Sequence, residues 1–211
     1  MKKLFLSLLV ALCGAVSLYA DDVAGVADAA EAARIAKAAE IAEVKAVVAK
    51  EFEFGAKGDF AGALDLYALD YRQTTRNGGT YNYVQVGWLF LALDGKHPAE
   101  FWLFAWSALR DGAMPSAEEQ ARMRAMARTP KGRETYEETL PQVIAAVRAE
   151  AALGLRTLKF VSVEVDGGRA VAVIEYDSKR ENGAIKTEIG TIDLRKINGE
   201  WKFYRCVYKD K

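Results

Sequence analysis

The last third of the chain carries the pattern that most restricts the fold. Four runs there have the alternation and the β-branched and aromatic content of strands: 157–166, 169–177, 185–196 and 201–208. Three turns separate them: Asp166-Gly167-Gly168, Glu181-Asn182-Gly183 and Asn198-Gly199. Glycine supplies the positive φ that tight hairpins need, so these runs predict a four-stranded antiparallel meander.

The residues before the meander predict helices, which makes the expected fold class α+β. Apolar residues at 41, 44, 48 and 52 fall at helical spacing, as do Phe60, Ala63, Leu64, Tyr67 and Tyr71. A turn at 55–59 separates these two segments, and 76–79 predicts a short hairpin. A further helix is expected at 84–93. A second should begin at a capping box formed by Ser116 and Glu119. A third is expected over 133–153, with Gly154 as its C-terminal cap.

The first twenty residues have the three-part pattern of a secretory signal peptide. Lys2 and Lys3 precede an apolar run over 4–20, and Ala20 suits cleavage before an acidic, Ala-rich stretch. We therefore expect an exported protein, periplasmic or secreted, that meets the membrane only through this targeting signal. Lipidation at Cys13 and an uncleaved anchor are the less favoured alternatives, because Leu12 is bulky for a lipoprotein site and the apolar run is short.

Charge and cysteine content argue against several functions. The chain has 29 basic and 29 acidic residues, so loss of Lys2 and Lys3 leaves a slight acidic excess and no basis for nucleic-acid binding. Cys206 is then the only cysteine, which excludes an intramolecular disulfide and predicts a small buried apolar side chain. One histidine and one cysteine give no metal-ligand set, and no phosphate-binding glycine loop is present, so no cofactor is expected.

Several segments together resemble a known superfamily. They are Lys57-Gly58-Asp59-Phe60, Asn77-Gly78-Gly79, Val165-Asp166-Gly167-Gly168-Arg169-Ala170 and Asn198-Gly199-Glu200-Trp201-Lys202-Phe203. In this order the chain resembles the nuclear transport factor 2-like superfamily, a cystatin-like α+β cone that also houses ketosteroid isomerase and the SnoaL-type polyketide cyclases. The resemblance implies N-terminal helices on a curved C-terminal antiparallel sheet, an enclosed cleft, and homodimers across the sheet.

The domain organisation follows from these patterns. We expect a signal peptide at 1–20, an Ala-rich helical arm at 21–40, and a single domain at 41–211. A helical insertion at about 112–156 has no counterpart in compact relatives. It would cap the mouth of the cone, bind a partner, or merely extend the fold.

Weak catalytic candidates are Glu175 and Asp193 on predicted strands and His97, the single histidine. A carboxylate inside an apolar cone would have a raised pKa and serve as a general base. The alternative for Glu175 is a solvated sheet face or a cross-strand ion pair, and the same holds for Arg205. The predicted pocket residues are Tyr71, Trp88, Trp102 and Arg205.

No recognisable catalytic set emerges, so the leading prediction is a non-catalytic domain. It would bind a small hydrophobic ligand or an envelope protein. The first alternative is an isomerase, cyclase or dehydratase that works by proton transfer in the cone. The second is a structural oligomerisation module that uses the arm and the sheet.

Overall fold

The computed structural model describes residues 2–94, 102–105, 115–180 and 182–211, with side chains from residue 28 onward except at 135. These residues form two compact units, Met1–Ala42 and Glu43–Lys211. The helices are α1 (Lys2–Lys57), α2 (Phe60–Leu64), α3 (Tyr83–Leu93), α5 (Ala117–Ala127) and α6 (Pro130–Thr157). The strands are β1 (Tyr67–Thr74), β2 (Thr80–Asn82), β3 (Lys159–Asp166), β4 (Arg169–Lys179), β5 (Ile185–Ile197) and β6 (Glu200–Asp210).

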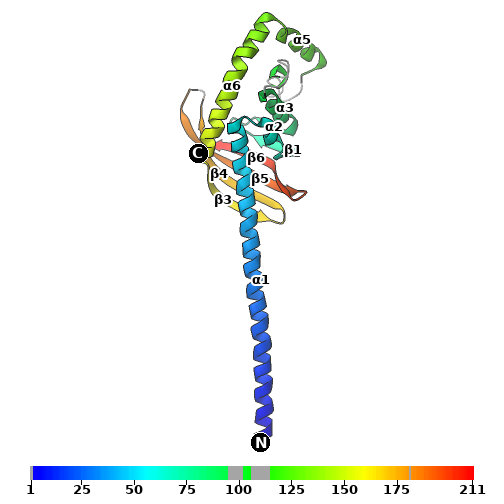
Figure 1. Ribbon diagram of the computed structural model, residues 1–211, viewed down its shortest axis with the longest axis vertical. Coiled ribbons are helices and arrows are strands. Elements are labelled where there is room, and N and C mark those ends of the chain that lie inside the picture. The colour runs from blue at the N-terminus through cyan, green and yellow to red at the C-terminus, as the bar shows by residue number, and fades with distance from the viewer. Residues whose placement is uncertain (1, 95–101, 106–114, 181) are drawn as a thin grey trace. The chain divides into compact units, whose positions relative to one another are not determined.

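The predicted α+β class and the C-terminal meander are confirmed. Strands β3 to β6 pair antiparallel in chain order and belong to a six-stranded sheet with the order β2-β1-β6-β5-β4-β3 (Figure 1). The β5–β6 turn has φ of 51° at Asn198 and 85° at Gly199, the left-handed pair that a two-residue hairpin requires. The sheet is mixed, because β1 runs parallel to β6.

The prediction that the helix starting at Phe60 continues through Tyr67 and Tyr71 is wrong. Helix α2 ends at Leu64, and both tyrosines lie on β1, which pairs with β6. A spacing of four residues fits one face of a strand as well as one face of a helix, so the pattern alone was ambiguous. Both side chains are buried, with ring centroids 4.6 Å apart.

The part of α1 from Glu43 onward packs on one face of the sheet, which we call the inner face. Val44 and Val48 are fully buried, as the helical spacing predicted. The Phe52 ring meets the Tyr176 ring of β4 edge-on at 5.1 Å between centroids. The inner face carries alternate residues of β4 and β5 together with Phe203: Ala170, Ala172, Ile174, Ile192 and Leu194. Apolar burial between this helix and the sheet forms the core of the second unit.

Helix α6 lies against α1 and β4, and its end differs from the prediction. Gly154 is not its C-terminal cap but an internal residue, where an added Cβ would lie 2.6 Å from Cε1 of Phe52. The glycine is needed because the two helices approach closely. Helix α6 ends instead at Thr157, whose Oγ1 accepts a hydrogen bond of 2.8 Å from the Asp177 amide of β4.

The predicted turns and caps are otherwise confirmed. Asp59 caps α2 through the Gly62 amide at 3.0 Å, and the capping box of Ser116 and Glu119 begins α5. The β1–β2 hairpin closes through a 2.8 Å bond from the Thr75 amide to the Gly79 carbonyl. Among the helices in the described part of the chain, none has the length and apolarity needed to span a bilayer.

Candidate functional site

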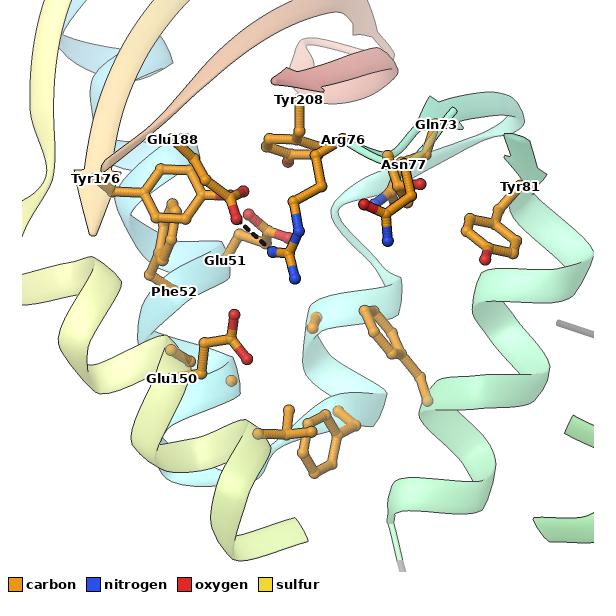
Figure 2. Close-up of a pocket in the computed structure, with 17 residues that line it drawn as sticks. Glu51, Phe52, Gln73, Arg76, Asn77, Tyr81, Glu150, Tyr176, Glu188 and Tyr208 are labelled. Atoms are coloured by element: carbon orange, nitrogen blue, oxygen red, sulfur yellow. Dashed lines mark hydrogen bonds and ion pairs between the residues drawn. The ribbon is translucent and has the colours of Figure 1, made fainter. Parts of the chain in front are cut away.

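The second unit contains a cavity of about 480 Å³ that is partly open to solvent. It is lined by three helices from the first half of the chain, by helix α6, by the β1–β2 hairpin and by the inner face of the sheet (Figure 2). Its polar lining residues are Glu51, Gln73, Thr75, Arg76, Asn77, Tyr81, Glu150, Tyr176, Glu188 and Tyr208. Its other lining residues are Phe52, Gly55, Phe60, Ala63, Phe90, Val147 and Ala151.

Glu188 of β5 is the centre of a hydrogen-bond network in the cavity wall. Its side chain is buried and accepts four hydrogen bonds, from Arg76 Nη1 at 2.5 Å, Ser178 Oγ at 2.6 Å, Tyr176 Oη at 2.8 Å and Arg180 Nη1 at 2.9 Å. The bond from Arg76 connects the turn between β1 and β2 to β5 (Figure 2). A buried charge with four donors is fully compensated, so this network fixes the shape of the wall.

The network keeps Glu188 ionised. Burial alone would raise the pKa of this carboxyl, but the hydrogen bonds from Ser178, Tyr176 and Arg76 outweigh it and lower the pKa below its usual value. The pKa of Tyr176 is raised in turn, first by burial and then by the Glu188 charge. The tyrosine therefore remains a hydrogen-bond donor at neutral pH.

Two further carboxylates point into the cavity (Figure 2). Glu51 of α1 is half-buried and accepts a bond of 2.6 Å from Tyr67 Oη, and burial raises its pKa more than this bond lowers it. Glu150 of α6 is more exposed, and its pKa is raised by partial desolvation and by the Glu188 charge. Groups of this kind can exchange a proton or bind a cation near neutral pH.

The remainder of the cavity is apolar. The rings of Phe60 and Phe90 lie with centroids 6.1 Å apart, and Val147 and Ala151 of α6 form the facing wall. The cavity therefore combines a polar region at the hairpin and sheet with an apolar region between helices, the composition typical of a small-molecule site.

Gly190 of β5 makes room for one wall of this cavity. A Cβ at this position would lie 3.0 Å from Tyr208 Cε1 and 3.0 Å from Ile174 Cγ1. The absence of a side chain thus allows the Tyr208 ring to pack closely against Gly190. Glycine in a strand interior often marks such a close approach.

The catalytic candidates named from the sequence do not line this cavity. Glu175 and Asp193 lie on the outer face of the sheet, where Glu175 pairs with Lys211 Nζ at 2.8 Å and Asp193 with Arg205 Nε at 2.7 Å. Asp193 of β5 and Arg205 of β6 thus form the cross-strand pair that was the alternative for Arg205, whereas Lys211, the partner of Glu175, lies just beyond the end of β6. His97 lies outside the described residues.

Arg205 lies on the outer face because β6 contains a bulge. Asp193 pairs with Arg205 while Leu194 pairs with Phe203, so Tyr204 is an extra residue in the ladder. Phe203 and Cys206 consequently both face inward. Simple alternation would place Arg205 on the same side as Phe203, and the inserted residue reverses that placement.

The three aromatic candidates lie in different places. Tyr71 is buried behind the cavity wall, and its Oη donates to Gln73 Oε1 at 3.2 Å. Trp88 is half-buried on α3 and does not line the cavity. Trp102 lines a second cavity of about 260 Å³ with Met126 and Tyr136. The aromatic predictions therefore do not converge on one site.

Sequence reasoning missed Glu51, Arg76, Glu150 and Glu188. A signal for Glu188 was present, because it alternates with Gly190, Ile192 and Leu194 and so shares their inner face. For Arg76 no local signal exists, because its partner is 112 residues away in sequence.

Metal and thiol chemistry find little support in the described residues. Within them, no group of three or more histidine, cysteine, aspartate or glutamate side chains is arranged to hold a metal ion. Cys206 is buried, as predicted, and burial raises the pKa of its thiol to about 12. Such a thiol is un-ionised at neutral pH and is a poor nucleophile.

Fold and cavity together define an α+β domain with a pocket, and several solved structures are similar to this chain. The chain is similar to an NTF2-like protein with a cystatin-like fold from Novosphingobium aromaticivorans, with 16% identity, TM-score 0.46, and coverage of 85% of this chain and 86% of that one. It is similar to an NTF2-like protein of unknown function from Shewanella baltica, with 14% identity, TM-score 0.42, and coverage of 82% and 95%.

A ketosteroid isomerase-like protein from Erwinia carotovora atroseptica is also similar, with 10% identity, TM-score 0.42, and coverage of 81% of this chain and 95% of that one. These likenesses concern the fold alone. No protein-family model and no curated protein matches the chain.

Proposed function

We propose that the chain is an exported domain that binds a small molecule in the cavity between α1, α6 and the sheet. The observation that carries this proposal is the cavity itself, about 480 Å³ in volume, with polar and apolar regions. Its volume falls within the range of small-molecule sites, and such sites combine apolar walls with a few placed polar groups. Export rests on the signal-like pattern of residues 1–20.

The rigidity of the wall supports binding. Glu188 joins Arg76 of the β1–β2 turn to Arg180, which directly follows β4, and Arg180 also pairs with Asp210 at the end of β6. A ligand that enters a preformed site loses less free energy to the ordering of side chains and loops. The wall thus favours binding without a large rearrangement.

Native mass spectrometry of the protein isolated gently from its host tests the proposal. The wild-type protein is expected to retain one small molecule. Val147→Trp, which fills the apolar region from α6, is expected to lose it. Val161→Trp, at an exposed position on β3, is the matched control and should retain it. An empty wild-type protein, or equal retention by both variants, would contradict the proposal.

A second candidate function is proton transfer within the same cavity, as in an isomerase, cyclase or dehydratase. Glu51 favours it, because this half-buried carboxylate has a raised pKa and lies 2.6 Å from a tyrosine hydroxyl. Turnover of the retained molecule, abolished in Glu51→Gln and kept in Glu175→Gln on the outer face, would support catalysis. Unchanged turnover in Glu51→Gln would exclude this role for Glu51.

The other sequence predictions stay predictions: an envelope-protein partner, a homodimer across the sheet, and oligomerisation through the arm at 21–40.

A further inference from the structure

The charge of the cavity lining is strongly unbalanced. Three glutamates and one arginine are its only lining residues of charged type, among the residues that the structure describes. The one arginine, Arg76, forms an ion pair with Glu188, which is itself saturated by four donors. Within the described residues, Glu51 and Glu150 form no ion pair, although Arg76 and Arg180 attract the Glu150 charge at longer range.

These two carboxylates have unused acceptor capacity. Within the described residues, Glu51 receives its hydrogen bond from Tyr67 on one oxygen, and no donor lies on Glu150. The pKa of each carboxyl group is raised, because desolvation disfavours its ionised form. A cation in the cavity would relieve this penalty, whereas an anion would increase it.

The aromatic lining points to the same ligand charge. Six aromatic residues line the cavity: Phe52, Phe60, Tyr81, Phe90, Tyr176 and Tyr208. The faces of such rings attract ammonium and quaternary ammonium groups, and the attraction grows when the cation is desolvated. Carboxylates beside aromatic faces thus form an environment suited to an organic cation.

An anionic ligand would have to use Arg76. To free this guanidinium, the ligand must break its 2.5 Å contact with Glu188, whose side chain is 5% exposed. Removing one partner of a buried ion pair is strongly unfavourable. An anion at the remaining N–H groups of Arg76 would share the cavity with Glu51 and Glu150, two carboxylates that form no ion pair within the described residues. The lining therefore disfavours carboxylate and phosphate ligands.

We propose that the ligand of this cavity is a small amphipathic cation, an amine or quaternary ammonium group on an apolar body. The cationic end lies between Glu51 and Glu150, and the body packs against Phe60, Phe90 and Val147. This inference rests on the proposed function, because it specifies the ligand class of the same cavity.

Calorimetric titration with three probes of equal carbon number tests the ligand class: phenylbutylamine, phenylbutanol and phenylbutyrate. We expect the amine to bind most tightly and the carboxylate most weakly. Glu51→Gln and Glu150→Gln should each raise the Kd for the amine about 10- to 100-fold, the effect of losing one charge-assisted hydrogen bond. They should leave the Kd for the alcohol nearly unchanged.

Glu164→Gln, at an exposed position on β3, is the matched control and should change no Kd. Val147→Trp should weaken all three probes, because it fills the region that holds the common hydrocarbon. Circular dichroism of each variant verifies that it is folded.

The outcomes separate this inference from the proposed function. Tightest binding of phenylbutyrate, weakened by Val147→Trp, would overturn the cation assignment and leave small-molecule binding intact. Amine binding that responds equally to Glu51→Gln and Glu164→Gln would also overturn it, because the attraction would then be general surface charge. Failure of all three probes would refute this ligand class, and retention of a native ligand in mass spectrometry would still decide the proposed function.

Discussion

Substitution of Glu188 by glutamine is expected to destabilise the protein far more than an equivalent change on the outer face of the same strand. Glu188 is 5% exposed and holds Arg76 and Arg180, whose side chains are 30% and 12% exposed. The neutral amide removes the charge that compensates both arginines and presents an N–H group to other donors. Removal of one partner of a buried pair costs about 3 to 5 kcal/mol.

The matched control is Asp193→Asn, five residues further along β5. Its carboxylate pairs with Arg205, which is 58% exposed, so solvent screens the interaction. Exposed pairs contribute about 0 to 1 kcal/mol. Urea unfolding at neutral pH, followed by circular dichroism, should give a loss of about 3 kcal/mol or more for Glu188→Gln and about 1 kcal/mol or less for the control.

The pH dependence of this difference is a further test. The folded-state pKa of Glu188 lies below the ordinary value of a glutamate side chain. Its stabilising contribution is therefore fully present above that value and is lost as the pH falls through the folded-state pKa. The difference in the free energy of unfolding between wild type and Glu188→Gln should therefore become smaller at acidic pH. The reasoning would be refuted if Glu188→Gln lost no more stability than Asp193→Asn. It would also be refuted if the stability difference between wild type and Glu188→Gln stayed constant down to strongly acidic pH.

Three further predictions concern other parts of the domain. Glu51→Gln should raise the free energy of unfolding at neutral pH in urea titrations, because the folded-state pKa of Glu51 is raised and its ionised form opposes folding above that pKa; a clear loss would contradict this. Gly154→Ala should lower that free energy by about 1 to 3 kcal/mol, because the added methyl group overpacks against Phe52 and this outweighs the better helix propensity of alanine. Equal or higher stability would show that α1 and α6 can move apart without cost. Cys206 should resist thiol reagents at mildly alkaline pH until urea unfolds the protein, because burial raises its pKa to about 12; rapid reaction of the folded protein would show that the sheet opens.

The sheet was predictable where its information is local. The turns at 166–168 and 198–199 fix the meander, because their glycines meet the φ requirement of hairpins within two or three residues. Strand β1 was not predictable in this way. Its parallel partner β6 lies more than a hundred residues later, and the four-residue spacing of Tyr67 and Tyr71 fits helix and strand alike.

The cavity was harder to predict than the fold, for two physical reasons. One extra residue in β6 reverses the inside–outside alternation, so Arg205 lies outside while Cys206 remains inside. The lining also joins residues such as Glu51, Glu150 and Glu188, which are distant in sequence and come together only in the folded chain. The alternation of Glu188 with Gly190 was the one local signal that indicated a carboxylate on the inner face.

Amide chemical shifts followed by NMR during titration with phenylbutylamine test the central claim most directly. Binding in the cavity predicts saturable shifts on α1 near Glu51, on α6 near Glu150 and on the hairpin near Arg76, with little change near Glu175 on the outer face. Shifts confined to the outer face, or non-saturating shifts spread over the whole surface, would contradict the assignment of this cavity as a binding site for a small cation.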